Sequence, residues 1–372
     1  MKTLKLTVPG APTNWHAKSY VNQKSPLSND WKIEVNTRIL EADAWFVCED
    51  LVDEEERCSV PSGMLFLGSA ETSYEHDWIV SSKAVNAFYS QFDRVHTFNM
   101  FEPQKTVPSI PFLPWMLHAN HGPSIFAQPG YQELMSYNPK LEDKQKRIAL
   151  FCSNQDLTSG HRVRKYFAEN LVKYFGDKVD WFGNGIQKVD TKYEVYSKYQ
   201  YSIVLENQSR SNILTEKLGD AFLGYTFPFY WGAPNASDFY NPLGFEAINI
   251  FNFYESVTKI EEALAEDKYI NAFIHILDNR NRSLNSINFL HRILEIVDQN
   301  YRISSSNTRR DVTLNSISVW KSSLGYHKKT LTSNIYLFLR RIDNRFGLNL
   351  TPLVHELQVL ILNNPLARRV RK

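Results

Sequence analysis

The stretch Tyr199–Pro234, which reads YQYSIVLENQSRSNILTEKLGDAFLGYTFPFYWGAP, decides the fold of this chain. Its β-rich run predicts a buried strand, and two polar residues follow where that strand ends. A threonine then precedes an apolar-faced segment that a glycine ends, which is typical of a helix. The expected order is strand, polar loop, helix and strand, over Tyr201–Leu205, Glu206–Thr215, Glu216–Gly224 and Thr226–Tyr230.

Charge is concentrated where this helix begins. Thr215 is placed to cap the helix, Glu216 lies in its first turn, and Lys217 supplies a mobile cation. A helix N-terminus offers unpaired N–H groups and a positive dipole end, so it suits a phosphate or diphosphate. A carboxylate such as Glu216 can also accept hydrogen bonds from the vicinal hydroxyls of a ribose. The alternative is an ordinary βαβ unit with a surface Glu–Lys pair.

Glu206 and Asn207 stand at the carboxyl end of the first strand of this stretch. In open α/β sheets that end is where ligands bind. We therefore expect both residues to line the same ligand site as the helix start.

The stretch resembles the conserved pattern of glycosyltransferase family 10, the α-1,3/1,4-fucosyltransferases. That pattern has a strand ending in Glu-Asn, a spacer of this length, Thr-Glu-Lys-Leu, a helix rich in small residues, and a proline-containing strand ending in glycine. The matching positions are Glu206-Asn207, Thr215-Glu216-Lys217-Leu218, Ala221, Pro228 and Gly232, and the likeness extends over about 147–254. Two departures concern the donor. Ile213 stands where the family often has tyrosine and Asn212 where aspartate is common, and the arginine- and aspartate-rich segment of the family is not evident.

An earlier strand–helix pair is predicted to open the same nucleotide-binding domain. Arg147–Ser153 reads as a strand with Ser153 and Asn154 at its end, and Arg164–Tyr174 as a helix. The resemblance implies an arginine near this helix start that binds the diphosphate, and the spacing favours Arg164 over Arg162. The alternative is two surface arginines.

A third strand of this domain is expected over Val179–Gly185. It ends in a glycine turn that includes Gly183 and is similar to a turn of the family. Strands alternating with helices predict a parallel sheet.

The part before about Lys144 is predicted to be a separate α/β domain. A helix-like run ending at Glu41 precedes the second of four short apolar runs that predict strands. These runs are Leu4–Val8, Ala44–Val47, Met64–Leu67 and Val95–Phe98.

The catalytic base is expected just after the third of these strands. In the family the equivalent strand is followed by a glutamate regarded as the base, which implies Glu71 here. Glu102 has a more family-like local sequence but a less fitting place in the order of strands, so it stays the alternative. Either residue is otherwise a solvated loop glutamate.

Three features lie between the two domains. The prolines of Pro103–Pro114 predict a rigid loop. His118 and His121 lack an evident third ligand and are expected to be loop or acceptor-site residues rather than metal ligands. Lys140–Arg147 is charged and predicted to be an interdomain linker.

The chain after Asn252 is predicted to be helical, over Ile260–Leu277 and Ser286–Asp298, with Trp320 closing the second domain. The tail 331–372 carries apolar stripes with many arginines. Basic amphipathic helices of this kind can lie on an anionic membrane. The alternative is that they pack on the second domain or on a partner subunit.

Overall composition fits this interpretation. A length of 372 residues suggests about two domains, and a net charge of +2 argues against a nucleic-acid partner. Three cysteines form no disulfide framework and indicate a reducing compartment. The N-terminus does not read as a signal peptide, and no apolar run approaches the length of a membrane span. Since the Golgi members of the family have an anchor helix, the chain is more similar to the bacterial members.

The predicted architecture is α/β and GT-B-like, with two Rossmann-like domains facing across a cleft and C-terminal helices. The predicted domains are 1–144 for the acceptor, 145–330 for the nucleotide sugar, and the tail 331–372. The resemblance implies an inverting transfer of a sugar, L-fucose from GDP-fucose being favoured, to a hydroxyl of an oligosaccharide or glycolipid of lipopolysaccharide or O-antigen type. Protein cations would stabilise the leaving diphosphate, so no metal or other cofactor is expected.

The donor residues expected from the sequence are Ser153, Asn154, Arg162, Arg164, Gly183, Glu206, Asn207, Thr215, Glu216 and Lys217. The expected location is the cytoplasm, with the tail as a potential peripheral contact to the inner membrane. Two alternatives stay open, namely a transferase using another nucleotide sugar and an inactive nucleotide-sugar-binding paralogue. A Rossmann oxidoreductase is disfavoured because no Gly-x-Gly-x-x-Gly follows a predicted strand.

Overall fold

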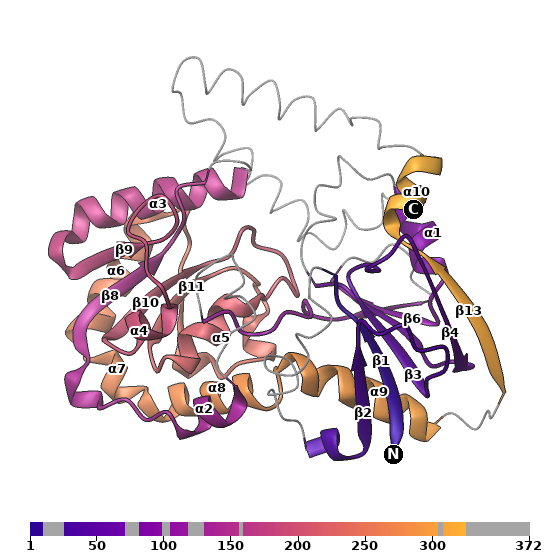
Figure 1. Ribbon diagram of the computed structural model, residues 1–372. Coiled ribbons are helices and arrows are strands. Elements are labelled where there is room, and N and C mark those ends of the chain that lie inside the picture. The colour runs from indigo at the N-terminus through magenta and orange to yellow at the C-terminus, as the bar shows by residue number, and fades with distance from the viewer. Residues whose placement is uncertain are drawn as a thin grey trace. The chain divides into compact units, whose positions relative to one another are not determined.

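The computed structural model describes residues 1–9, 26–70, 82–98, 105–117, 130–155, 159–303 and 308–324. These residues form two compact units, each built on its own sheet (Figure 1). The first unit comprises 1–114, 129–133 and 285–330, and the second comprises 115–128, 134–284 and 331–372, of which only the described residues are discussed. Glu71, Glu102, His118, His121 and the tail 331–372 lie outside the described residues.

The sheet of the first unit has six parallel strands in the order β2-β1-β3-β5-β6-β7. The strands are β1 (Lys2–Thr7), β2 (Trp31–Val35), β3 (Ala44–Cys48), β5 (Leu65–Gly68), β6 (Arg94–Thr97) and β7 (Thr106–Pro108). All five residues of β3 are buried, as expected of a central strand covered on both faces.

Helices cover this sheet, and a separate antiparallel ribbon pairs β4 (Glu55–Pro61) with β13 (Arg309–Asn315). The helical elements of this unit are η2 (Pro26–Asn29), α1 (Ser82–Ser90), α9 (Phe289–Ile303) and α10 (Ile317–Leu324). Trp320 of α10 packs against the apolar core of this unit, next to buried residues of α1 and β13. Residues 285–303 and 308–324 therefore complete the first unit.

The sheet of the second unit has five parallel strands in the order β12-β11-β10-β8-β9. The strands are β8 (Gln145–Phe151), β9 (Val179–Phe182), β10 (Tyr199–Leu205), β11 (Phe227–Trp231) and β12 (Glu246–Ala247). Every residue of β11, and every residue of β10 except Gln200, is buried. The unbroken apolar runs of the sequence thus correspond to strands that helices cover on both faces.

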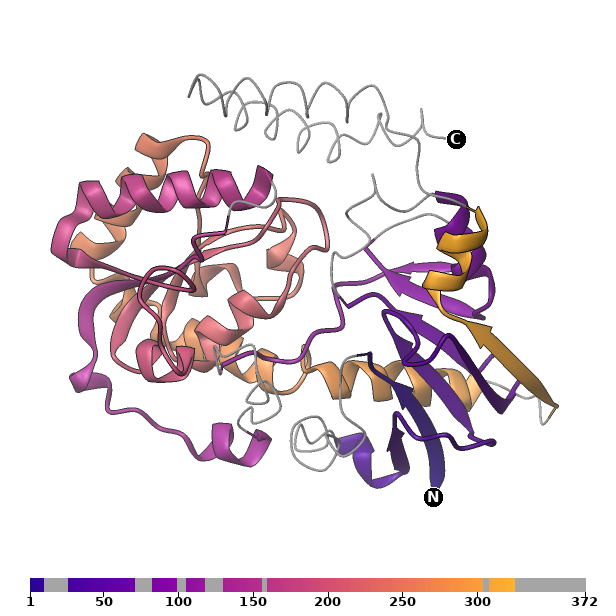
Figure 2. The same cartoon turned by 45° about the horizontal axis from the view of Figure 1, so that its top comes forward.

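Helices on the two sides of this sheet enclose its core, with α3 on one side and α8 on the other (Figures 1 and 2). On the first side, the rings of Phe167 in α3 and Phe253 in α6 meet edge to face. The helical elements are α3 (Ser159–Phe175), α4 (Lys192–Tyr196), α5 (Glu216–Leu223), α6 (Phe253–Ala265), α7 (Lys268–Asn271) and α8 (Phe273–Leu284). Short 3-10 turns are η5 (Leu141–Asp143), η6 (Gly176–Lys178), η7 (Ala236–Asp238) and η8 (Pro242–Gly244), and α2 (Tyr131–Ser136) spans the division between the units.

The predicted α/β class, with a parallel sheet in each half, is confirmed. The facing of the two halves across a cleft stays a prediction. The contact-based division differs from the predicted boundaries 1–144 and 145–330, because 115–117 and 134–144 lie in the second unit and 285–324 in the first.

Four local predictions are wrong. The run before Glu41 is not helical but contains strand β2, and the proline-rich loop contains strand β7. Trp320 belongs to the core of the first unit instead of closing the second domain. Within the predicted linker, Lys144 is buried and donates to the carbonyls of Tyr196, Tyr199 and Gly224, so this segment is part of the second unit.

Candidate nucleotide-binding site

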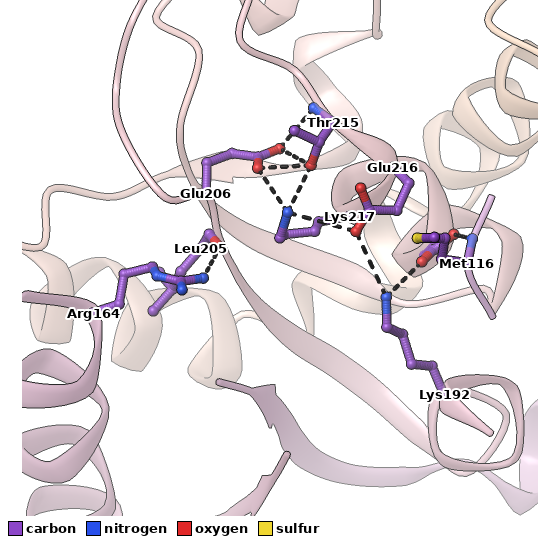
Figure 3. A network of polar contacts seen from close by, with 9 residues as sticks. Met116, Arg164, Lys192, Leu205, Glu206, Thr215, Glu216 and Lys217 are labelled. Carbon is purple, nitrogen blue, oxygen red and sulfur yellow. Dashed lines mark hydrogen bonds and ion pairs between the residues drawn. The ribbon is translucent and has the colours of Figure 1, made fainter. Parts of the chain in front are cut away.

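The carboxyl edge of the second sheet brings together residues that are far apart in the sequence. Strand β10 ends at Leu205, and helix α5 begins eleven residues later, at Glu216. The carboxylate of Glu206 lies between them, is fully buried and is hydrogen-bonded to the turn before α5 (Figure 3). This edge is where the sequence predicted the ligand site.

Glu206 is the centre of a short hydrogen-bond network. Its Oε1 accepts from the Thr215 amide at 2.9 Å, and its Oε2 lies 2.7 Å from Thr215 Oγ1. Lys217 Nζ is 3.2 Å from Glu206 Oε2 and donates to Thr215 Oγ1 at 2.8 Å. In the structure the Glu206 carboxylate holds Thr215 and Lys217 in place, and its expected role in lining the ligand site stays a prediction.

Thr215 occupies the N-cap position of α5, although its side chain makes no capping hydrogen bond. The prediction that it caps the helix through its hydroxyl is wrong, because that hydroxyl binds Glu206 instead. The first turn of α5 is thus left without this side-chain cap, and the Glu216 carboxylate accepts a hydrogen bond from its own backbone N–H there.

Lys217 is the more exposed of the two lysines in this network, with 27% of its side chain exposed against 17% for Lys192. Burial lowers the pKa of Lys217, but the neighbouring Glu206 and Glu216 carboxylates outweigh burial and raise the pKa above its ordinary value. The ammonium therefore stays charged, and it lies within 4 Å of two carboxylates from which it would have to turn to bind a phosphate.

Glu216 lies between two lysines. Its Oε1 is 3.5 Å from Lys217 Nζ and 4.0 Å from Lys192 Nζ. Burial raises the pKa of Glu216, but Lys217 and Lys192 lower it further than burial raises it, so the side chain is an anion. An anionic carboxylate at this point can accept hydrogen bonds from ribose hydroxyls, the role that the sequence predicted.

Arg164 approaches the same edge from α3. Its Nη1 donates to the Leu205 carbonyl at 3.1 Å, and its side chain is nearly buried, which lowers the pKa of the guanidinium. Its Nε has no hydrogen-bond partner among the described residues. The alternative prediction, that Arg164 is a surface arginine, is therefore wrong. Arg162 is half-buried.

Two glycines allow backbone segments to meet at this edge. A Cβ on Gly160 at the start of α3 would lie 1.8 Å from the carbonyl oxygen of Asn207. A Cβ on Gly183 would lie 2.6 Å from the Cys152 carbonyl oxygen, and the φ of +147° there also favours glycine. Only a residue without a side chain lets these turns come so close together.

The other predicted donor residues lie on the same sheet edge. Ser153 is half-buried and Asn154 exposed just after β8, and the Asn154 amide donates to the Asn184 carbonyl beyond β9. The edge thus gathers Ser153, Asn154, Gly183, Arg164, Asn207 and the start of α5 at the ends of β8, β9 and β10. Neither Glu71 nor Glu102 is placed relative to this edge, and the choice of base stays a prediction.

Two residues of the charged network were missed by the sequence analysis. Lys192 is the first residue of α4, and Asp220 is one turn after Glu216 in α5. The sequence feature that could have identified Asp220 is a carboxylate four residues after Glu216, on a helix face that is otherwise apolar. Lys192 follows the capping Thr191, but nothing in the local sequence links it to α5.

A separate pocket of about 510 Å³ opens beside the ends of β11 and β12. Its lining is mainly aromatic and apolar, with Trp231, Phe245, Ile248 and Phe251 among the members. It contains none of the predicted donor residues. It adjoins the charged network at Trp231, whose carbonyl accepts from the Glu206 amide at 2.8 Å, and at Gly232, where a Cβ would lie 2.4 Å from Glu206 Cγ.

Residues 141–290 match the profile of glycosyltransferase family 10 (fucosyltransferase), C-terminal part. The matched segment covers less than half of the chain. It contains the whole charged network except Met116, together with all five strands of the second sheet.

One curated relative of this segment is an alpha-(1,3)-fucosyltransferase FucT of Helicobacter pylori. The two are 32% identical over 152 residues, which are 40% of this chain and 27% of that protein. The chain thus matches about a quarter of the length of this relative.

Solved structures with a related shape have low sequence identity to this chain. An alpha1,3-fucosyltransferase crystallised with GDP has a TM-score of 0.48 and 15% identity, covering 82% of this chain and 91% of that chain. The Anabaena protein Alr3699/HepE in complex with UDP has a TM-score of 0.43 and 10% identity. The match covers 80% of this chain and 100% of that chain.

Within the ranges that the structure describes, no group of three His, Cys, Asp or Glu side chains is arranged as metal ligands would be. Among those same residues, no helix combines the length and the apolar character that a bilayer crossing requires.

Proposed function

We propose that this chain is an inverting glycosyltransferase that moves L-fucose from GDP-fucose to a hydroxyl of a glycan acceptor. The observation that carries the proposal is the position of Lys217, a charged and partly exposed lysine at the start of α5 within the segment that matches family 10. A lysine at a helix N-terminus is suited to a leaving diphosphate.

In the proposed reaction the acceptor oxygen attacks the anomeric carbon while the bond from that carbon to the diphosphate oxygen breaks. Glu71, with Glu102 as the alternative, takes the proton of the attacking hydroxyl. GDP leaves with the electron pair, and Lys217, Arg164 and the α5 N-terminus stabilise its charge. Glu216 holds the ribose, and Glu206 keeps Lys217 correctly placed.

The acceptor proposed is an oligosaccharide or glycolipid of lipopolysaccharide or O-antigen type. The proposed place of action is the cytoplasm, where the basic tail 331–372 either contacts the inner membrane or packs on protein. No metal is proposed, since protein cations are available for the leaving group.

A donor screen tests this function. Calorimetry with GDP, UDP and CMP and their sugars should give binding to GDP and GDP-fucose, and hydrolysis of GDP-fucose should give turnover without knowledge of the acceptor. Failure of every guanine nucleotide to bind would contradict the proposal. Retained GDP binding with no hydrolysis and no transfer would favour an inactive paralogue.

The base is identified by two matched variants. Glu71→Gln should bind GDP-fucose normally and fail in transfer, since the amide cannot accept the proton. If Glu102→Gln loses transfer and Glu71→Gln does not, the base is Glu102.

A second candidate is a transferase that uses another nucleotide sugar. Ile213, at the position where the family often has tyrosine, is only 1% exposed. It therefore presents no side chain to a donor sugar, and the donor panel above separates this candidate from the first.

A further inference from the structure

A second ion pair lies behind Glu216, on the side away from Glu206 (Figure 3). Lys192 Nζ is 2.8 Å from Asp220 Oδ2, and Asp220 Oδ1 accepts a hydrogen bond from the Met116 amide at 2.9 Å. The same Lys192 Nζ is 4.0 Å from Glu216 Oε1. Lys192 thus lies between the carboxylate of Asp220 and the carboxylate expected to bind ribose.

Lys192 is fixed at both ends. Its backbone amide donates to the Leu117 carbonyl at 2.6 Å, and it begins helix α4 directly after the capping Thr191. Its side chain is 17% exposed, whereas that of Asp220 has no exposure at all. Because a fully buried carboxylate is costly without a cation, Asp220 holds the Lys192 ammonium where it is.

The charges around Glu216 explain why this position matters. Without ligand, Lys217 lies near both Glu206 and Glu216. If Lys217 turns to a phosphate oxygen, Lys192 is the other cation within 4 Å of Glu216. Lys192 therefore keeps Glu216 ionised and in place while Lys217 is used by the ligand.

We propose that Lys192 is a positioning residue for nucleotide binding, which acts by neutralising Glu216 so that Lys217 is released to the diphosphate. The proposal rests on the function proposed above, since it assumes a diphosphate at the start of α5. Asp220 anchors Lys192 and has no direct contact with the nucleotide.

The test compares two variants that lack the same carboxylate. Lys192→Met alone would leave Asp220 buried without its cation and destabilise the fold. Asp220→Asn is therefore the reference, and Lys192→Met with Asp220→Asn is the test variant. Isothermal calorimetry with GDP should give a Kd about tenfold higher for the double variant than for Asp220→Asn, the size expected for one lost cation near a charged site.

Kinetics distinguish positioning from a general structural role. In the double variant the KM for GDP-fucose should rise by about the same factor, with kcat at saturating donor within about threefold of Asp220→Asn, because Lys217 still meets the leaving group. Lys192→Arg, which keeps the cation, should bind GDP within about threefold of the native protein. Lys178→Met is the control, since this exposed lysine lies at the opposite end of the sheet, just before β9.

The outcomes separate the two proposals. Equal GDP affinity of the double variant and Asp220→Asn, with both folded by thermal unfolding, would overturn the role of Lys192. A loss of affinity in Lys192→Arg as large as in the double variant would also overturn it. Absence of GDP binding by the native protein would instead overturn the proposed function.

Discussion

The carboxyl edges of the two parallel sheets differ in the kind of polar group that they bury. In the second unit the edge carries a network of buried or partly buried charges, with Glu206, Glu216 and Lys217 as neighbours. At the described strand ends of the first unit, the Glu49 carboxylate accepts from the Ala70 amide at 2.7 Å, and Ser69 Oγ donates to Thr97 Oγ1 at 2.8 Å. His96, also at this edge, is buried and its pKa is lowered to about 4, so it is neutral near pH 7.

This contrast teaches how the two halves of such a protein divide their work. A network of paired charges is costly to bury, so it is retained where a charged ligand must be met by groups already in place. Hydroxyl pairs cost less to bury, and under the proposed function they suit an edge that would meet the neutral hydroxyls of an acceptor. The following variants challenge this division, beginning with the largest expected effect.

Lys217→Ala should lower the turnover of GDP-fucose by about 10²- to 10³-fold, the effect of removing one group that stabilises transition-state charge. The measurement is the initial rate of donor hydrolysis or transfer at saturating donor. Lys178→Ala, which removes an exposed lysine from the same unit, should leave the rate unchanged. Transfer kinetics equal to those of the native protein would refute the phosphate role of Lys217.

His96→Phe should change how stability responds to acid. Burial, followed by the Arg292 and Arg94 charges, lowers the pKa of His96 to about 4 from an ordinary value of 6.5. The folded state thus disfavours the proton, so the contribution of His96 is fully present above pH 6.5 and is lost as the pH falls toward 4. The native protein should lose about 2–3 kcal/mol over this window relative to His96→Phe.

Guanidinium unfolding at pH 7, 6, 5 and 4 measures this difference. In both proteins Asp220 should act in the opposite sense, since burial raises its pKa to about 6 and the ionised form costs stability as the pH rises through that value. Parallel pH curves for the native protein and His96→Phe would show that His96 is not the acid-sensitive group.

Gly160→Ala adds a methyl group at the predicted ligand edge of the second unit. Gly68→Ala adds the same group in the sheet of the first unit. The first would bring Cβ to 1.8 Å from the Asn207 carbonyl oxygen, and the second to 2.6 Å from the Phe112 ring. Each should cost about 1–3 kcal/mol of stability by overpacking. Only Gly160→Ala should also weaken GDP binding in calorimetry, and equal GDP affinities for the two variants would contradict the placement of the site.

Ser69→Ala and Ser202→Ala remove buried hydroxyls that form similar pairs in the two sheets. Ser202 Oγ is 2.8 Å from Thr226 Oγ1, as Ser69 Oγ is from Thr97 Oγ1. Each change should lower the free energy of unfolding by about 1 kcal/mol and leave GDP affinity unaltered. A much larger loss of unfolding free energy for either variant would mean that the serine hydroxyl stabilises more than the hydrogen bond to its partner threonine.

Much of the second unit was predictable because its strands are continuous apolar runs and its helix starts carry local signals. Strand β10, helix α5 and the end of α5 at Gly224 follow from residue types within one short stretch. The grouping of Glu206, Lys217 and Arg164 followed from the rule that parallel strands present their carboxyl ends together. These inferences depend on local pattern and on one general property of sheets.

The contacts that were missed are those set by packing between distant segments. Lys192 and Met116 meet Asp220 across 28 and 104 residues of sequence, and no local motif specifies such a meeting. Strand β2 was mistaken for a helix because a short half-buried strand carries little periodicity. The hydrogen bonds between Thr215 and Glu206 were also missed, because a threonine directly before a helix ordinarily caps that helix.

The pairing of β13 with β4 has a consequence for how the chain folds during synthesis. About 250 residues separate the two strands, and the whole sheet of the second unit is made between them. The second unit is therefore an insertion, whose strands have all emerged before the first unit receives its last strand. We expect β4 to lack its partner strand until β13 has been synthesised, which leaves a strand edge of the nascent first unit unpaired for most of synthesis.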